Sequence, residues 1–486
     1  MKTHTYQVSW LQLVLLLLPA VRSAASDFSQ RIAVLDSLSL PLVNLIVDTA
    51  LMGNSHFTSG RIAIIDPLRW AGGQQVSVYD CQLRYRGNWA LNYEKKSFAV
   101  KLTDSSGKKL DVSVLGIRDE NSWILDAMSF DCMRMRNRVC FDLWNSFSRT
   151  PYATEYDSRN GTLGRFVEVF LNDGYHGLYC LSDKVDRKLL GLKKAKTDGM
   201  GGVALHGLLY KCNDITYPAD LLLEYGEYAT DSMCWDAWEL QYPEDYPSAE
   251  TWQPLKDLID FCAYENTTNE EFSRRADEWF YADNLVDYFL FCNALLLRDN
   301  IKNRFLSTRD IVDGHRYLMT PWDMDIAFGY DTFDRCTDDT VDLHFLCVAA
   351  PYARLHDNEH YDFYRRVSLR WEQLRQGPLS PDSVMLRMYA YARRLDESGA
   401  WRRERDRWNG NPRWLDTAAV CRLPQVREWY ERNSEAITRQ LKVVTSVRPV
   451  HRDIVSPVVY DLQGRRLMGK PGKGVYIQHG KKYVME

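Results

Sequence analysis

The spacing of apolar residues changes near residue 193, and this change constrains the fold more than any other feature of the sequence. Before it, short β-branched or alternating runs are separated by glycine, asparagine or proline, as in strands joined by turns. After it, apolar residues recur mainly at helical intervals. A further pair of strands, within residues 303–328, interrupts these helices. The pattern predicts an α+β protein with a β-rich first half and an α-rich second half.

Within the first half, two elements are predicted most clearly. The alternating runs RFVEVFL and GLYCLSDKV are joined by a segment containing Asn172, Asp173 and Gly174. An Asp-Gly step between such runs favours a tight turn, so we expect a β-hairpin here. Helical spacing predicts a helix over Asp131–Phe147.

Composition limits the class of protein. The chain has 486 residues, enough for about three domains or for one large domain with additions. It carries 65 acidic and 61 basic residues, a net charge of −4, whereas a nucleic-acid-binding domain usually has a basic face. Hydrophobic residues at 45% and charged residues at 26% are typical of globular proteins. We therefore expect a folded protein without a nucleic-acid partner.

The N-terminus has the pattern of a signal peptide. Lys2 precedes an apolar run from Trp10 to Leu18, Pro19 ends that run, and small residues follow at 23–26. The run is too short for a bilayer core of about 30 Å, and no later stretch approaches the roughly 18 apolar residues of a spanning helix. We expect a signal peptide at residues 1–25 and a secreted, cell-surface or outer-membrane protein without a transmembrane segment.

The cysteines give no metal or redox signal. All 11 lie between Cys81 and Cys421, and none belongs to a CxxC pair. Two interpretations stay open: some form disulfides in an oxidising compartment, or most are small buried apolar residues.

Two acidic motifs are the first candidates for chemistry. Asp323 and Asp325 follow the strand HRYLMT within the motif WDMD. Residues two apart on a strand share a face, where two carboxylates can bind Mg²⁺. Upstream, RDNIKN places Asp299 four residues before Asn303. In phosphoryl transfer an aspartate orients the accepting hydroxyl and an asparagine holds a metal. The alternative is that all four residues only cap turns.

A basic hairpin is the second candidate. RYRGN at 84–88 is followed by KKSFAVKL at 95–102, which places Arg86, Lys96 and Lys101 where they can contact nucleotide phosphates. Neither GxxxxGK[ST] nor GxGxxG occurs, so P-loop and Rossmann chemistry are not supported. The alternative is a solvated strand face.

A third motif, HDNEH at residues 356–360, fits the HxxEH pattern of some zinc hydrolases, with Glu359 as the base. Asp357 and Asn358 are polar, however, whereas a metal-binding helix is normally packed into a core. A polar helix start is the favoured interpretation, and a zinc hydrolase is the less favoured alternative.

Ordered motifs cover the chain from about residue 41 to 440. They are RYRGN with KKSFAVKL, LGIRDENSWIL with MRMRN, RFVEVFLNDGYHGLYCLSDKVDRKLLGLKK, DYFLFCNALLLRDNIKNRFLSTRD, YLMTPWDMDIAFG, SLRWEQLRQGPLS and REWYERNSEAI. Each resembles a segment of the spore coat protein H (CotH) kinase family. Their order over most of the chain makes the resemblance specific, although each motif is short.

This resemblance implies a divergent protein-kinase-like fold with two lobes, a β-rich lobe at about 27–193 and a mostly helical lobe at about 194–444. It implies a secreted or surface-attached kinase that uses ATP with Mg²⁺ or Mn²⁺ and phosphorylates Ser or Thr of an extracellular protein substrate. The residues implied are Asp299 and Asp323 for catalysis, Arg86, Lys96, Lys101 and Asn303 for ATP, and Asn303, Asp323 and Asp325 for the metal.

Three departures from the family pattern keep a second interpretation open. Trp89 stands where the family has a serine, LSDK at 181–184 replaces LTEK, and Asn303 lies one residue closer to Asp299 than in an ordinary kinase loop. A noncatalytic relative that binds nucleotide or partners is therefore the alternative.

The end of the chain has a pattern of its own. Residues 445–457 are expected to be a linker, and residues 458–486 a small β unit. The segment VVYDLQGRRLMGKPGKGVYIQHGKKYVME resembles the C-terminal sorting domain used by type IX secretion in the Bacteroidota. That resemblance implies contact with secretion machinery, and the alternative is a minor β appendage.

Overall fold

The computed structural model describes most of the chain. It covers residues 40–66, 76–152, 159–197, 202–244, 246–331, 333–357, 362–408, 419–447, 474–478 and 481–485. The expected signal peptide at 1–25 and most of the expected linker at 445–457 lie outside these residues. The chain divides into two compact units, residues 1–440 and 441–486, and each is described by itself.

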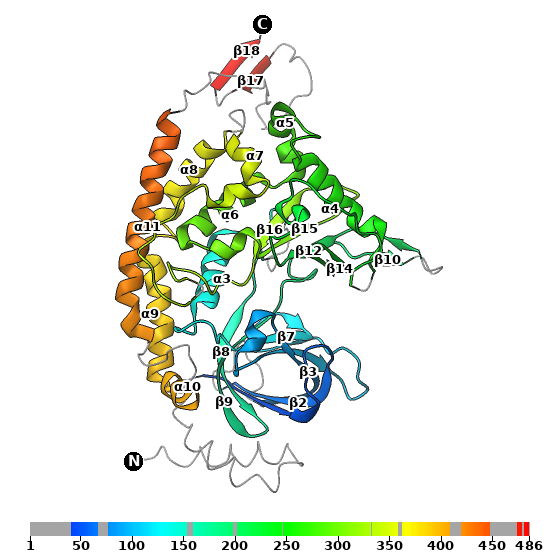
Figure 1. The fold of residues 1–486 in the computed structure, drawn as a ribbon, viewed down its shortest axis with the longest axis vertical. Coiled ribbons are helices and arrows are strands. Elements are labelled where there is room, and N and C mark those ends of the chain that lie inside the picture. The colour runs from blue at the N-terminus through cyan, green and yellow to red at the C-terminus, as the bar shows by residue number, and fades with distance from the viewer. Residues whose placement is uncertain are drawn as a thin grey trace. The chain divides into compact units, whose positions relative to one another are not determined.

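The structure confirms the α+β class. Strands predominate in the first part of the larger unit and helices in the later part (Figure 1). Seven of the early strands close into a barrel, which the sequence did not predict. The two-lobed kinase-like arrangement therefore stays a prediction.

The barrel strands are arranged in the order β1-β2-β3-β4-β7-β9-β8. The closing pair, β1 and β8, is parallel, and every other barrel pair is antiparallel. Two short strands, β5 (Val112–Ser113) and β6 (Asp119–Glu120), pair outside it. The bounds of the barrel strands are β1 Leu42–Val47, β2 Thr58–Ile65, β3 Val76–Arg86, β4 Ser97–Thr103, β7 Ser122–Asp126, β8 Gly164–Leu171 and β9 Gly174–Ser182.

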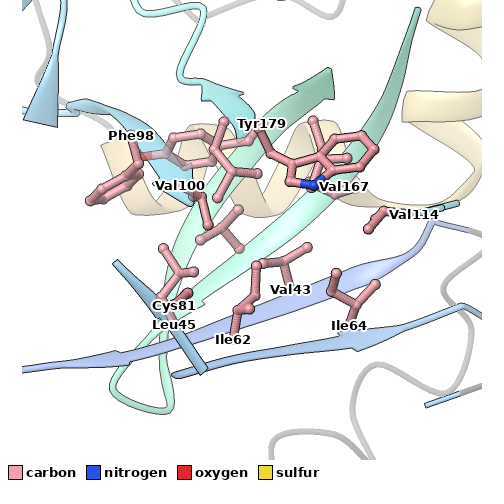
Figure 2. Close-up of a cluster of buried hydrophobic side chains, with 14 of the residues drawn as sticks. Val43, Leu45, Ile62, Ile64, Cys81, Phe98, Val100, Val114, Val167 and Tyr179 are labelled. Carbon is pink, nitrogen blue, oxygen red and sulfur yellow. The ribbon is translucent and has the colours of Figure 1, made fainter. Parts of the chain in front are cut away.

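Strand alternation fills the barrel with apolar side chains. On β4, Phe98, Val100 and Leu102 are buried in the same apolar cluster as Val43 and Ile62, and Figure 2 shows part of this cluster. The other residues of β4 point away from the cluster because successive side chains of a strand alternate between its two faces. The outward face of β3, β4 and β7 therefore carries the polar residues of this region.

The predicted hairpin is confirmed as β8 and β9. Its turn lies one residue earlier than the Asp-Gly step suggests: Leu171 pairs with Gly174, and the two turn residues are Asn172 and Asp173. Both have positive φ, 49° and 65°, as a two-residue type I′ turn requires. The Asn172 side chain also bonds both backbone groups of Val47 at 2.9 Å, which ties the turn to β1.

The helical part also contains a five-stranded sheet of order β13-β14-β12-β15-β16. The predicted strand pair within 303–328 is confirmed as β15 and β16. Tyr210 on β12 and Tyr317 on β16 donate to backbone carbonyls of α4, which packs this helix on the sheet. The sheet strands are β12 Leu208–Cys212, β13 Cys234–Trp235, β14 Trp238–Tyr242, β15 Arg304–Thr308 and β16 Tyr317–Pro321, with β10 Lys196–Thr197 and β11 Val203–Ala204 paired separately.

Helix α6 lies at the centre of this part, because every residue from Asn284 to Leu295 is buried. Helix α3 begins five residues after the predicted start, since the Asp131 carboxylate accepts the Met135 and Arg136 N–H groups as a cap. The helices are α3 Arg136–Phe147, α4 Ala249–Cys262, α5 Asn269–Trp279, α6 Ala282–Leu295, α7 Tyr352–Asp357, α8 Phe363–Arg375, α9 Pro381–Glu397, α10 Ala400–Trp408 and α11 Ala419–Val447.

The cysteines behave as apolar residues. All 11 lie in the described ranges as free thiols, and seven of them are buried. Burial raises the pKa of Cys81 and Cys180 to about 12. These thiols therefore pack as small neutral groups, which favours the buried-residue interpretation.

In the smaller unit, β17 (Gly474–Gln478) and β18 (Lys481–Met485) form an antiparallel pair. This agrees with the expected β unit. A sorting role for it stays a prediction.

Candidate functional site

The segment after β16 carries the first candidate residues. Trp322 N–H donates to the Asn303 carbonyl at 3.2 Å, which extends the β15–β16 pairing by one residue. The buried Asn300 side-chain amide donates to the carbonyls of Asn303 and Trp322 at 2.8 and 3.0 Å. These bonds fix where the strand stops and where the acidic segment begins.

Asp323 turns the chain out of the strand. Its φ of 57° lies in the left-handed region, which is uncommon for a residue other than glycine and is frequent at functional sites. The alternation that predicted one shared face for Asp323 and Asp325 therefore ends at Trp322. The two carboxylates still influence each other: burial raises the pKa of Asp325 well above its usual range, and the charge of Asp323 raises it further.

Asp126, at the end of β7, faces this segment from the barrel, and sequence reasoning missed it. Its carboxylate accepts the Met128 N–H at 3.0 Å and the Asn137 amide at 3.3 Å. The Asn137 amide oxygen accepts the Met324 N–H at 3.2 Å. Asn137 on α3 thus joins the barrel carboxylate to the segment that carries Asp323 and Asp325. The only sequence signal is the Asp that ends the alternating run SWILD.

Asp299 approaches from the end of α6. It lies on the 3-10 turn Arg298–Ile301, and its carbonyl accepts the Asn303 N–H at 2.8 Å. Its half-buried carboxylate is 3.8 Å from the ammonium of Lys302. Asn303 is buried beside the turn. The charge of Asp299 acts on Asp323, whereas no contact among the described residues joins the Asn303 side chain to these carboxylates.

The charges of Asp126 and Asp299 act on Asp323, and the charges of Asp126 and Asp323 act on Asp325. The Asp323 side chain is exposed on one side, yet desolvation by the protein packed around it raises its pKa to about 6. The charges of Asp126 and Asp299 raise that pKa as well, while those of Lys211 and Arg86 oppose the rise. We call Asp126, Asp299, Asp323 and Asp325 the acidic group.

Arg86 is the predicted cation that the structure brings to the acidic group. It ends β3 opposite Ser97, whose hydroxyl donates to the Asp126 carboxylate at 3.4 Å. Burial lowers the pKa of Arg86, and the charges of Asp126 and Asp323 oppose that shift. The guanidinium therefore faces two members of the group.

Lys96 and Lys101 have other neighbours. The Lys96 ammonium donates to the carbonyls of Leu91 and Tyr93 and holds the loop between β3 and β4. Lys101 lies on the outward face of β4, with its ammonium 4.5 Å from the centre of the Phe57 ring. Burial lowers the pKa of Lys101, and the charge of Glu244 opposes the shift. Their roles in binding ATP stay predictions.

Lys211, on β12, is a cation that sequence reasoning did not select. Its ammonium lies 3.9 Å from the centre of the Trp322 ring. Trp322 is the residue directly before Asp323 in the chain. Burial lowers the pKa of Lys211, and the charges of Glu239 and Asp323 oppose the shift while that of Arg86 reinforces it. In the sequence it is an isolated lysine in a strand, without a motif around it.

The donor set of the acidic group fits a hard divalent cation. Among the described residues, no hydrogen bond or ion pair reaches the side-chain carboxylates of Asp323 and Asp325. Carboxylate oxygens are the ligands that Mg²⁺ and Mn²⁺ prefer, and neither histidine nor cysteine belongs to the set. The metal-binding roles of Asp323 and Asp325 stay predictions, since among the described residues no three carboxylates of the acidic group have ligand atoms within 4.8 Å of one another.

A second acidic cluster nearby is closed by its own partners. Ligand atoms of Asp131, Cys132 and Asp334 lie within 4.8 Å of one another. However, Arg136 pairs with both carboxylates, at 3.3 Å to Asp131 and 2.5 Å to Asp334, and it donates to the Asp325 carbonyl at 2.7 Å. Through Arg136, this cluster therefore helps to fix the backbone of the segment that carries Asp325.

The HDNEH motif is described only in part. His356 lies in α7, where its Nδ1 is 2.8 Å from the Tyr364 hydroxyl and its ring centre is 4.5 Å from that of His344. Glu359 and His360 lie outside the described residues. The zinc interpretation stays an untested alternative.

Comparison with known families decides the assignment. The family model described as CotH kinase protein matches residues 83–437, from within β3 to within α11. The chain belongs to the CotH kinase family. Its matched region contains all four carboxylates of the acidic group, as well as Arg86 and Lys211.

Two further findings complete the comparison of this CotH family protein. No curated protein matches its sequence. Within the described ranges, no helix has both the length and the apolar composition needed to cross a membrane.

Proposed function

We propose that this CotH family protein is a secreted or surface-attached kinase that transfers the γ-phosphate of ATP to Ser or Thr hydroxyls of an extracellular protein. The observation that carries this proposal is a set of four carboxylates from three segments, near enough for their charges to act on one another and on Arg86. Two of them, Asp323 and Asp325, have no hydrogen-bond or ion-pair partner among the described residues. Phosphoryl transfer depends mostly on positioning and on charge stabilisation, which such a set can supply.

The residues divide the work according to their position. Asp323 and Asp325 would hold Mg²⁺ or Mn²⁺, and the bound ion would offset charge on the phosphate oxygens. Asp299 would orient the acceptor hydroxyl and take its proton. The hydroxyl oxygen then bonds to the γ-phosphorus as the bond from that phosphorus to the departing ADP oxygen breaks. Arg86 would pair with phosphate oxygens as a two-pronged donor.

Other assignments belong to the same proposal but rest on resemblance. Lys96, Lys101 and Asn303 are proposed ATP contacts, Asn303 is also a proposed metal ligand, and residues 458–486 are a proposed type IX sorting unit that meets the secretion machinery.

The test is phosphate transfer. The purified chain is incubated with γ-labelled ATP and Mg²⁺ or Mn²⁺, alone and with casein-like acceptors, beside Asp323→Asn. Asp338→Asn is the control, because this aspartate is 97% exposed in an ion pair with Arg432. We expect label with the wild type and the control and a loss of at least about 100-fold with Asp323→Asn. ATP binding without label would favour the noncatalytic alternative. The absence of both ATP binding and label would refute the proposal.

A further inference from the structure

Lys211 is held in place next to the acidic group. It lies on β12 of the five-stranded sheet, opposite Glu239 on β14 and Phe305 on β15. The indole N–H of Trp322 donates to the carbonyl of Cys212 at 3.2 Å, so the ring that the Lys211 ammonium covers is itself fixed. Since Trp322 precedes Asp323, this contact sets the ammonium beside the segment that carries the metal ligands.

The Lys211 ammonium has no anionic partner among the residues that the structure describes. Among the described residues it makes no hydrogen bond and no ion pair, although it is half-buried. Its cross-strand neighbour, Glu239, is engaged elsewhere: its carboxylate accepts the side-chain amides of Asn213 and Gln241, at 2.5 and 3.0 Å. A cation partly withdrawn from water without an acceptor is unfavourable, and an anionic ligand would remove that cost.

Arg86 is in the same situation on the barrel side. Its guanidinium is half-buried and likewise makes no hydrogen bond or ion pair with any described residue. Arg86 comes from β3 and Lys211 from β12, so the charge of a cation from each of two sheets acts on Asp323. Two cations flanking a metal-binding carboxylate suit a ligand with several phosphate groups, because the metal and the cations bind different oxygens.

We propose that Lys211 is a phosphate-binding residue, which acts with Arg86 to hold the β- and γ-phosphates of a metal-bound nucleoside triphosphate. This assignment rests on the function proposed above and deepens it. The Lys211 ammonium on the sheet and the forked Arg86 guanidinium on the barrel bind the polyphosphate from two sides. The clamp recognises polyphosphate and leaves the base and ribose to other contacts, so it separates ATP from AMP.

The test compares affinities for ATP and AMP in the presence of Mg²⁺, measured by isothermal titration calorimetry on the full chain. The variants are Lys211→Met, which keeps the length of the side chain without its charge, and Lys188→Met as the control, because Lys188 is 41% exposed and pairs with Asp111. We expect Lys211→Met to weaken ATP binding about 10- to 100-fold and to leave AMP binding unchanged. The control should match the wild type for both ligands.

The melting temperature without ligand separates binding from a structural role. Since the ammonium has no acceptor among the described residues, Lys211→Met should melt at the wild-type temperature or slightly above it. Unchanged ATP affinity in Lys211→Met, equal weakening for ATP and AMP, or a wild type that binds no ATP would each overturn the assignment. If ATP binding depends on Lys211 but no label is transferred, the clamp stands and the kinase proposal fails. If Lys211→Met binds ATP and transfers phosphate normally, the kinase proposal stands and the assignment of Lys211 fails.

Discussion

Two charged clusters in this protein contain similar residues and differ in how far their side chains are bonded to other described residues. In the first, Lys95, Arg134 and Glu404 are completely buried, and both cations meet the same Glu404 oxygen, at 2.7 and 2.8 Å. The other Glu404 oxygen accepts the Leu178 N–H at 2.8 Å. We call these three residues the closed trio. The second cluster is the acidic group with Arg86 and Lys211.

The closed trio uses its charges within the protein. The Lys95 ammonium also donates to the carbonyls of Ala127 and Leu178, and the Arg134 guanidinium donates to three further carbonyls between 128 and 131. It therefore ties α10 to β9 and to the loop after β7. In the second cluster, two carboxylates and two cations have no such partners among the described residues. Bonding partners within the protein therefore indicate a structural cluster, whereas accessible charges without such partners indicate a site for a ligand.

Breaking the closed trio should have the largest effect on stability. In Glu404→Gln, two buried cations lose their shared counter-ion, and we expect the free energy of unfolding to fall by about 3–5 kcal/mol. Urea unfolding followed by tryptophan fluorescence measures this change.

The matched control is Glu397→Gln on α9. Glu397 is 67% exposed and lies 3.6 Å from Arg393, so its loss should change stability by less than about 1 kcal/mol. Equal effects of the two substitutions would contradict the distinction between a matched buried cluster and an ordinary surface pair.

Removing one carboxylate from the acidic group should have a smaller effect, of opposite sign. The pKa of Asp323 is raised to about 6, whereas an unfolded aspartate titrates near about 3.9. The folded state therefore binds more protons between these values, and this group lowers stability as pH rises from about 4 to 6. In EDTA, Asp323→Asn should thus be more stable than the wild type above pH about 6 and equal to it below pH about 4.

Urea unfolding at several pH values measures this difference, which should be small because the side chain is exposed to solvent. A variant that is less stable than the wild type at neutral pH would show that Asp323 has a structural partner.

The sequence predicted elements whose cause is local. The basic hairpin predicted from RYRGN and KKSFAVKL is formed by β3 and β4, and the turn residues identified the β8–β9 hairpin within one residue. Asp323 and Asp325 could be selected because a motif directly follows a strand. Barrel closure could not be predicted, since it depends on pairing β1 with β8, more than 100 residues away.

Neither could the roles of the charged residues be read from local patterns. Lys95 and Lys96 are adjacent and look alike in the sequence. Lys95 can nevertheless be buried, because its ammonium donates a hydrogen bond to Glu404, 309 residues later. Asp126 and Lys211 were missed for the same reason: each meets Asp323 only after distant elements pack together.

The most direct test of the central claim is metal binding by the acidic group. Mn²⁺ is titrated into the EDTA-treated full chain, and the free ion is followed by electron paramagnetic resonance for the wild type, Asp323→Asn and the surface control Asp338→Asn. The account predicts that the wild type and the control bind Mn²⁺ and that Asp323→Asn loses at least about tenfold in affinity. Equal binding by all three proteins, or no binding by the wild type, would contradict it.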